Sequence, residues 1–396
     1  MIASNMNLNP FKGTKIFTFE RKVSVVRYIV SFIGVLLIGA LLIGAQGEDP
    51  VNAAKLIVKG AFGGRTQFGN SIRWATPCIL NGLAAIIAFK SGVNNLGIEG
   101  QMYIGAFTAG VMGYYVQLPP VVHVIVCLLC AGLAGVLWVG IPAIMRLFLR
   151  INEYVTTMMM NFVATLLCDY IVIWKIIPSL GIVTTTAATP PIQKTAELTR
   201  LIPATTANTG FILAVALVFI VWGMYRYTLV GYELKQVGEN LRFAQVGGVN
   251  VKTTFLAIFA LSGFCAGLCG GVEVTGGYHK YVSNFSALMG WEGIMIANIS
   301  NLNPIALLLI SLIWGALKTG AMAMERATTL NRLTVNLLQM IFVLCVSIDY
   351  EGIFRYFINK KRKKRVLPKA CARSKKKRRR RAESCFGIFV KLLSAL

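Results

Sequence analysis

Charged residues are scarce in this chain of 396 residues, at 14%, whereas apolar residues make up 56%. A soluble globular protein carries about a quarter charged residues, so this chain has too few to cover a water-facing surface. The composition therefore excludes a protein of the bulk cytosol, and the high apolar content excludes disorder over most of the length. The length instead accommodates about ten membrane helices of about 20 residues each, joined by short loops.

The sequence also lacks the motifs of several enzyme classes. Its only two histidines, His123 and His279, exclude a histidine-rich metal site. It contains no G-x-x-x-x-G-K-[S/T] loop to cradle ATP phosphates, no G-x-S-x-G and no H-E-x-x-H. We therefore expect that the chain is not an enzyme, that it binds no metal or cofactor itself, and that another polypeptide does any ATP-driven work.

Ten apolar segments predict an all-α polytopic membrane protein. We expect spans at about residues 24–45, 70–90, 94–117, 120–146, 153–177, 209–226, 253–272, 287–302, 304–323 and 333–349. Lys and Arg mark cytoplasmic flanks, and their distribution places both termini in the cytoplasm and the loops 46–69 and 178–208 on the other side. The predicted organisation is an N-terminal segment (1–27), a ten-span domain (28–352) and a tail (353–396).

Charged residues inside the predicted spans mark candidate functional positions. A charge at the bilayer centre costs about 2.5–3.5 kcal/mol on insertion scales, so it usually faces a cavity or a partner. The candidates are Glu99, Asp169, Lys175, Glu292 and Lys318. Asp169 and Lys175 lie six residues apart, a poor spacing for a pair on one helix face. Glu273 is expected near the outer surface, where a charge costs little.

Glu99 stands in a polar, glycine-rich stretch, NNLGIEGQ (94–101), at the start of the third apolar segment. Glycine permits non-helical backbone, which is tolerated at membrane depth where it lines a cavity or is buried in protein. The stretch is equally compatible with a cytoplasmic loop that leads into an asparagine-capped helix. The residues alone leave both interpretations open.

The motif around Glu99 has a counterpart in the second half of the chain. GIEGQM (97–102) and GWEGIM (290–295) match at four of six positions. Under the ten-span topology the two segments run in opposite directions, and paired glycine-interrupted segments in oppositely oriented halves point to inverted repeats around a transport site. Chance similarity between glycine-rich apolar segments is the alternative.

Two further patterns predict packing and docking. Gly263, Gly267 and Gly271 recur every fourth residue and therefore form a small-residue packing seam on one helix face. The loop 226–252 is polar and, at 27 residues, longer than most connections. Within it, Asn240 is suited to cap a helix over residues 241–246 that ends at the following glycines. Such a projecting helix suits a docking partner, although the loop could also be an ordinary connector.

Four stretches, in this order along the chain, resemble the permease subunits of bacterial ABC importers of the nucleoside and simple-sugar group. They are GLAAIIAFKSGVNNLGIEGQMYIG (82–105), NEYVTTMMMNF (152–162), GYELKQVGENLRFAQVGGVNV (231–251) and SGFCAGL (262–268). The resemblance covers residues 28 to 352. It departs from the family at the Asn94–Asn95 pair, where a single asparagine is more usual, and in the basic tail.

The resemblance implies a ten-helix ABC importer permease in the bacterial cytoplasmic membrane, with no chemistry on its cargo. It implies a second permease chain in a heterodimer, ATP-binding subunits that use the ATP, and a lipid-anchored binding protein outside. The cargo would be a nucleoside or a ribose-type sugar. The implied pathway residues, completed by Glu292 from the repeat motif, are Asn94, Asn95, Glu99, Gln101, Asn161 and Glu292. The residues implied to couple to the ATPase are Gly238, Glu239, Asn240, Ala244 and Gly248.

An alternative is a self-sufficient secondary transporter driven by an ion gradient, with Glu99 or Glu292 as the titrating group. An enzyme acting on lipid would need a nucleophile–base or metal cluster, and the sequence offers none.

Residues 355–396 hold 17 Lys and Arg against one acid, Glu383. This tail is expected to attract anionic lipid, at about 1 kcal/mol per base near the surface. Nucleic-acid binding is disfavoured because interleaved aromatic residues are missing, and a tail without a selected role is the third possibility.

Overall fold

The computed structural model describes residues 37–41, 43–179, 181, 187–286 and 288–328, together with Leu337 and Met340. The predicted N-terminal segment, most of the first and tenth spans and the basic tail lie outside these residues. The described part is helical, and the isolated bridges Ala188–Val282 and Arg200–Asn208 join its loops.

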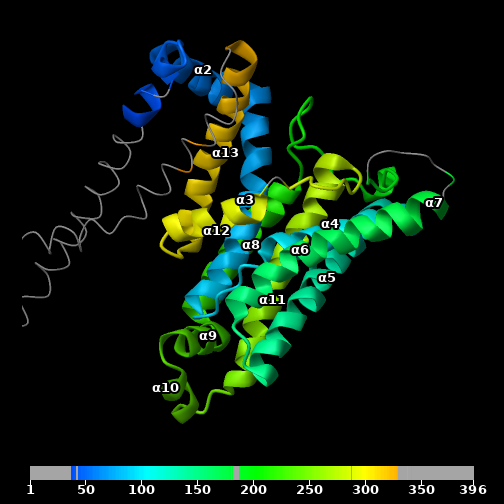
Figure 1. Cartoon of the computed structure of the whole chain (residues 1–396), viewed down its shortest axis with the longest axis vertical. Helices are drawn as coiled ribbons and strands as arrows, with labels where there is room; N and C mark the ends of the chain where they lie inside the picture. Colours follow the sequence, from blue (N-terminus) through cyan, green and yellow to red (C-terminus); the bar gives the residue numbers. More distant parts are fainter. Residues whose placement is uncertain are drawn as a thin grey trace, which may run out of the picture. The chain divides into compact units, whose positions relative to one another are not determined.

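The helices follow the apolar runs of the sequence (Figure 1). They are α2 (Pro50–Phe62), α3 (Arg65–Lys90), α4 (Ile98–Tyr115), α5 (Pro120–Leu149), α6 (Glu153–Ile171), η1 (Val172–Ile176), α7 (Ile177–Ser179), η2 (Lys194–Ala196), α8 (Gly210–Tyr227), α9 (Leu229–Glu239), α10 (Leu241–Val246), α11 (Val251–Glu273), η3 (Val274–Tyr278), α12 (Met289–Ile299) and α13 (Pro304–Ala327).

Six helical stretches among the described residues are long and apolar enough to cross a membrane, which makes the chain a multi-pass membrane protein. They begin with α3, α5, α6, α8, α11 and α13 and match six of the predicted spans within a few residues. The count of ten spans and the inverted repeats stay predictions. The predicted spans 94–117 and 287–302 are not among these six stretches, and the spans 24–45 and 333–349 lie largely outside the described residues.

Two elements differ from the sequence prediction. The segment 287–302 was expected to span, but α12 has only 11 residues; at about 1.5 Å per residue it is far shorter than the roughly 30 Å hydrocarbon core. The backbone turns directly after it, with positive φ at Asn301 and Leu302. The loop 46–69 contains α2, which begins where the Asp49 carboxylate accepts a hydrogen bond from the Val51 amide at 3.0 Å.

Helix α3 forms the centre of the fold. Its apolar stretch is 83% buried, against 28% for α5 and 22% for α6. It packs against α8, α11, α12 and α13, while α11 also packs against α4 and α5. The outer faces of α5, α6 and α8 carry exposed apolar side chains such as Leu137, Leu166 and Ile220, so they present an apolar surface suited to lipid or to another membrane chain.

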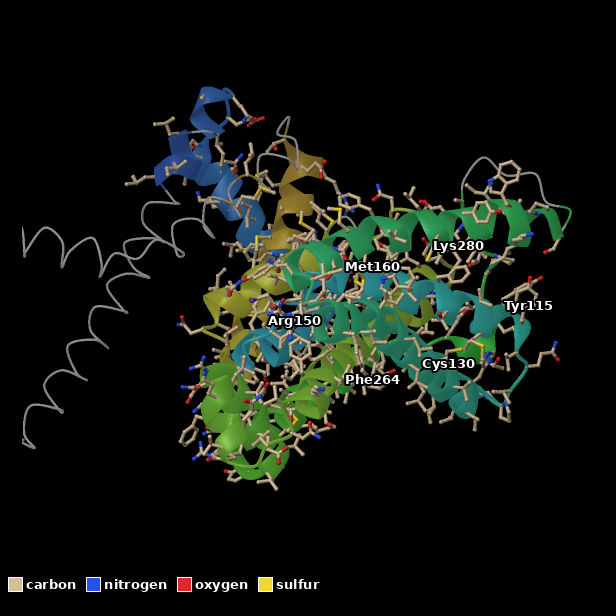
Figure 2. All side chains as sticks on the ribbon, turned by 60° about the horizontal axis from the view of Figure 1, so that its bottom comes forward. Tyr115, Cys130, Arg150, Met160, Phe264 and Lys280 are labelled. Atoms are coloured by element: carbon tan, nitrogen blue, oxygen red, sulfur yellow. The ribbon has the colours of Figure 1, made fainter. Side chains whose placement is uncertain are left out.

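Helices α4 and α5 run in opposite directions. Figure 2 shows Tyr115, the last residue of α4, and Arg150, directly after α5, at opposite ends of this helix pair. The described residues thus follow the up-and-down order that the ten-span topology predicts for these two segments.

The predicted glycine seam on α11 is confirmed. A Cβ on Gly267 would collide with the Ala131 carbonyl oxygen of α5, and one on Gly263 would lie 2.7 Å from the Gly135 carbonyl oxygen. Gly271 faces the same helix, and a Cβ there would lie 2.8 Å from the Ala131 methyl group. The absence of side chains along this seam lets the backbones of α11 and α5 approach closely.

Replacing Gly267 by valine should therefore separate α11 from α5. We expect a loss of stability of about 1–3 kcal/mol or more, read as a lower unfolding temperature and a smaller monodisperse fraction in mild detergent. Gly223→Ala is the matched control, because a Cβ there meets nothing within 4 Å and alanine favours helix by up to about 1 kcal/mol. An unchanged unfolding temperature for Gly267→Val would contradict this packing.

Candidate functional site

The connection between α3 and α4 is non-helical and partly buried. Gly92 has φ +71°, and a Cβ there would lie 2.7 Å from Cα of Gly238, while Asn95 is fully buried. Helix α4 begins after Gly97, without a side-chain hydrogen bond at its cap. The interpretation as an asparagine-capped helix start is therefore wrong, and a cavity lined by this backbone at membrane depth stays a prediction.

Asn95 joins three helices through its amide group. Its nitrogen donates to Gln101 Oε1 at 3.1 Å and to Ser262 Oγ at 2.9 Å. Its oxygen accepts from the Gly97 amide at 3.0 Å and from Gln101 Nε2 at 2.9 Å. Ser262 Oγ in turn donates to the Ala84 carbonyl at 2.8 Å. These bonds link the connection to α3, α4 and α11.

Asn161 on α6 supports the other side of the same connection. Its nitrogen donates to the Leu96 carbonyl at 2.9 Å, and its oxygen accepts from the Gly100 amide at 2.8 Å. A Cβ on Gly100 would lie 2.8 Å from Cα of Asn161. Asn161 therefore satisfies two backbone groups that have lost helical partners.

Glu99 joins the two similar motifs. Its carboxylate accepts hydrogen bonds from Ser286 Oγ and, at 2.6 Å, from the Gly290 amide in the first turn of α12. A helix N-terminus carries partial positive charge and stabilises an anion. The counterpart motifs thus meet in space, although their relation by inverted symmetry stays a prediction.

Four of the predicted pathway residues are hydrogen-bonded to other groups of the protein. Asn95, Glu99, Gln101 and Asn161 are all at least 92% buried, and each binds protein groups. Asn94 is partly exposed. They hold the irregular connection and α12 in place, and their contact with a cargo stays a prediction.

The remaining charged candidates are mostly paired. Glu292 on α12 binds Lys318 on α13 at 2.8 Å. Asp169 accepts from Tyr281 Oη at 3.2 Å and from Ser283 Oγ at 2.7 Å, which ties α6 to the loop after η3, whereas Lys175 is exposed.

Glu273 is buried inside the protein, and its expected place near the outer membrane surface stays a prediction. It is only 4% exposed, and Arg73 of α3 binds it at 2.7 Å. The Trp74 ring lies beside both ion pairs, with the Arg73 guanidinium carbon at 4.1 Å and Lys318 Nζ at 4.4 Å from its centroid. We call Arg73, Glu273, Trp74, Lys318 and Glu292 the charge array.

A cavity of about 630 Å³ opens beside the charge array, between α2, the first turns of α3, η3 and the end of α13. This volume is within the usual range for small-molecule sites, about 300–1,000 Å³. The polar and aromatic groups that line it include Gln67, Asn70, Arg73, Trp74, Tyr278 and Arg326. No local sequence pattern predicts this cavity, because its walls come from segments up to 270 residues apart, from Leu56 to Arg326.

The loop 226–252 forms a two-helix projection at the opposite end of α3 (Figure 1). The predicted helix α10 is confirmed, with Asn240 accepting from the Arg242 and Phe243 amides at 3.0 and 3.1 Å. Gly247 ends it, and Gly248 follows with φ +83°. The additional helix α9 was not predicted.

The residues proposed for coupling fall into two groups. Glu239, Asn240 and Gly248 are exposed. Ala244 is 2% exposed and packs in an apolar cluster with α9 and α11, and Gly238 packs on the connection after α3, where a Cβ would lie 2.6 Å from the Ser91 carbonyl carbon. These two residues anchor the projection on the protein body.

Three apolar side chains of α10 are exposed, and helical spacing places Phe243 and Val246 on one side of the helix. Leu241 is 52%, Phe243 62% and Val246 90% exposed. We call these three residues the exposed α10 face. Apolar side chains gathered on a short polar projection are typical of a protein contact.

Known proteins resemble most of this chain. The guanosine ABC transporter permease protein NupP of Bacillus subtilis is 29% identical over 85% of this chain and 96% of its own length. The glucose ABC transporter permease protein TsgB13 of Haloferax volcanii is 28% identical over 83% of this chain and 88% of its own. The nucleoside ABC transporter permease protein NupB of Lactococcus lactis is 27% identical over 75% of this chain and 83% of its own length.

These relatives confirm the resemblance to ABC importer permeases that the sequence motifs predicted. The model of a permease family, described as the branched-chain amino acid transport system permease component, matches residues 67–346. Because this match spans more than half of the chain, the protein belongs to that family of ABC transporter permeases and is a transport subunit.

Proposed function

We propose that this chain moves nucleosides across the cytoplasmic membrane by alternating access, as one membrane subunit of an ATP-driven importer. The observation that carries the proposal is the cavity beside the charge array. A nucleoside is a neutral molecule with an aromatic base and a hydroxyl-rich sugar. The Tyr278 ring suits the base, and the amide groups of Gln67 and Asn70 suit the hydroxyls.

The position of the cavity supports import. Under the predicted orientation, α3 begins on the extracytoplasmic side, so the cavity opens toward an external binding protein. Two relatives with nucleoside cargo in their names support the same cargo class. Because another relative is named as a glucose transporter permease, a sugar is the competing cargo class.

The two-helix projection over residues 226–252 supports the proposal that a separate subunit supplies the energy for transport. We propose that an ATP-binding subunit grips the exposed α10 face and that ATP is used only there. The projection is connected to the helix core through the segment after α3. Gly238 packs on Gly92, and the Tyr225 and Ser91 hydroxyls are hydrogen-bonded at 3.1 Å. Asn95, in the same segment, binds α4 and α11. A second permease chain and a lipid-anchored binding protein complete the proposed assembly.

An uptake panel tests the cargo. The complete importer, reconstituted with its binding protein, is given labelled guanosine in the presence of unlabelled inosine, cytidine, ribose or glucose. We expect saturable guanosine uptake that the nucleosides inhibit and the free sugars do not. Guanosine uptake that ribose or glucose inhibits while inosine and cytidine do not, or no saturable guanosine uptake at all, would contradict the proposal.

A further inference from the structure

A set of packed aromatic rings extends from the wall of the cavity beside the charge array into the protein. Tyr278 lines the cavity, and its ring centroid lies 5.7 Å from that of Phe285. The Phe285 centroid in turn lies 5.1 Å from that of Tyr103 and 6.1 Å from that of Tyr281. These last three side chains are at most 7% exposed. We call Tyr278, Phe285, Tyr103 and Tyr281 the aromatic barrier.

The aromatic barrier connects the cavity with the predicted pathway residue Glu99. At its inner end, Tyr103 Oη lies 3.4 Å from Ser286 Oγ, and Ser286 donates a hydrogen bond to the Glu99 carboxylate. The polar network of the predicted pathway residues therefore begins where the rings end. A cargo molecule that moves from the cavity toward Glu99 meets the aromatic barrier on the way.

Three of the four rings belong to one short segment, residues 278–286, between η3 and α12. Its chain turns at His279 and Asn284, which have φ of +55° and +58°. Its backbone bonds to the loop before η2. Its side chains are tied to the helices by two carboxyl groups, those of Asp169 on α6 and Glu99 on α4. The position of the rings therefore depends on a small number of polar contacts.

Asp169 has only hydroxyl partners. It accepts a hydrogen bond from Tyr281 Oη at 3.2 Å and one from Ser283 Oγ at 2.7 Å. Among the described residues, no Lys or Arg forms an ion pair with it. A carboxyl group inside a membrane span is costly, and such groups usually mark functional positions. The contact that Asp169 makes is with the segment that carries the rings.

Both elements that Asp169 joins contain a π-helical turn close to the contact. On α6, the π-helix η1 begins at Val172, three residues after Asp169. On the other side, the π-helix η3 ends at Tyr278. Such turns are rare, are frequent at functional sites and are points where a helix bends. The two elements therefore have irregular geometry on each side of the contact.

We propose that the aromatic barrier is the outer gate of the transport path and that Asp169 is the positioning residue that keeps it closed. The inference rests on the proposed nucleoside import and adds the residues that separate the cavity from Glu99. In the closed gate, Asp169 binds the Tyr281 and Ser283 hydroxyls. Opening breaks both bonds and moves the segment 278–286, with its rings, out of the path.

The test removes the bonds to Asp169 and keeps every ring of the aromatic barrier. Tyr281→Phe combined with Ser283→Ala deletes both hydroxyls, and Ser283→Ala alone deletes one and is the milder variant. Tyr170→Phe combined with Ser179→Ala is the matched control. It makes the same two chemical changes close to Asp169 in the chain, at side chains that are exposed.

Each variant is measured in the complete importer, reconstituted in liposomes with its binding protein and ATP. The readout is the number of ATP molecules hydrolysed, above the rate without binding protein, for each labelled guanosine accumulated. This ratio does not depend on how much importer is folded, because both rates scale with that amount. A gate that does not stay closed lets guanosine return to the outside, so it raises the ratio.

Deleting both hydroxyls should raise the ratio at least about 10-fold, because hydrogen bonds to charged groups are among the stronger ones. Ser283→Ala alone should raise it less, and the control should keep the wild-type ratio. If uptake and ATP hydrolysis fell together, at the wild-type ratio or to zero in both test variants, the role of Asp169 would be overturned. Guanosine uptake by the wild-type importer would then leave the proposed function intact, whereas uptake of no nucleoside by the wild type would overturn both.

Discussion

Replacing Phe243 by aspartate will abolish cargo uptake by the complete importer while this chain stays folded. Phe243 is 62% exposed on the exposed α10 face, so the substitution removes no core packing. It places a charge in the contact that the ATP-binding subunit is proposed to make, and an unpaired charge enclosed in an interface costs several kcal/mol. We expect uptake to fall at least about 100-fold and the ATP-binding subunit to be lost from the purified complex.

Phe243→Leu is the matched control for this experiment. It keeps an apolar side chain at the same place and should retain most of the uptake. Ala244→Asp should behave differently from both, because Ala244 is buried in the cluster that anchors α10 and its replacement should lower the stability of the chain itself. Normal uptake and normal ATPase copurification with Phe243→Asp would show that this face is not the docking surface.

Removing Glu292 alone will destabilise the chain more than removing both members of its ion pair. Glu292 and Lys318 are 14% and 13% exposed and lie 2.8 Å apart. Breaking a buried pair leaves one uncompensated charge and costs about 3–5 kcal/mol, whereas apolar replacement of both partners is often neutral. Glu292→Leu should therefore unfold at a lower temperature than wild type, and Glu292→Leu combined with Lys318→Met should recover most of the loss.

The exposed pair Lys235–Glu239 provides the comparison. Its side chains are 54% and 63% exposed, and such a pair on a helix contributes at most about 0.5 kcal/mol. Glu239→Leu should leave the unfolding temperature nearly unchanged. If Glu292→Leu also kept wild-type stability but lost uptake, Glu292 would act on a cargo or an ion and not as the partner of Lys318.

Much of the fold could be predicted because membrane helices are encoded in local sequence. The long apolar runs gave α3, α5 and α13 within a few residues, since lipid requires a helix long enough to cross it. Helix α10 was predicted from the capping chemistry of Asn240, and the seam on α11 from glycines at every fourth residue. Helix α2 lies in a segment that was predicted to be a loop, and α12 in one that was predicted to be a span. Both helices are too short for hydropathy alone to distinguish a short helix from a loop or from a membrane span.

The candidate site was predicted only in part, because its contacts join distant segments. The glycine-rich stretch around Glu99 carried a local signal, whereas Asn161 was predicted only from the family resemblance. Asn161 does bind this stretch in the structure, and Glu99 does bind the first turn of α12. Arg73 and Glu273 lie 200 residues apart, and no local pattern announces their ion pair. A charge within an apolar run is the signal that would have singled out Arg73, since such a group needs a buried partner.

The central claim is that this chain forms the transport pathway but does not itself use an energy source, and that another polypeptide drives transport with ATP. The most direct measurement is uptake of labelled guanosine into liposomes that hold either this chain with its second permease chain or the complete importer, with and without ATP and with ion gradients abolished. We predict uptake only by the complete importer with ATP. Sustained, concentrative uptake by the permease chains alone, driven by an imposed proton or sodium gradient, would contradict the account.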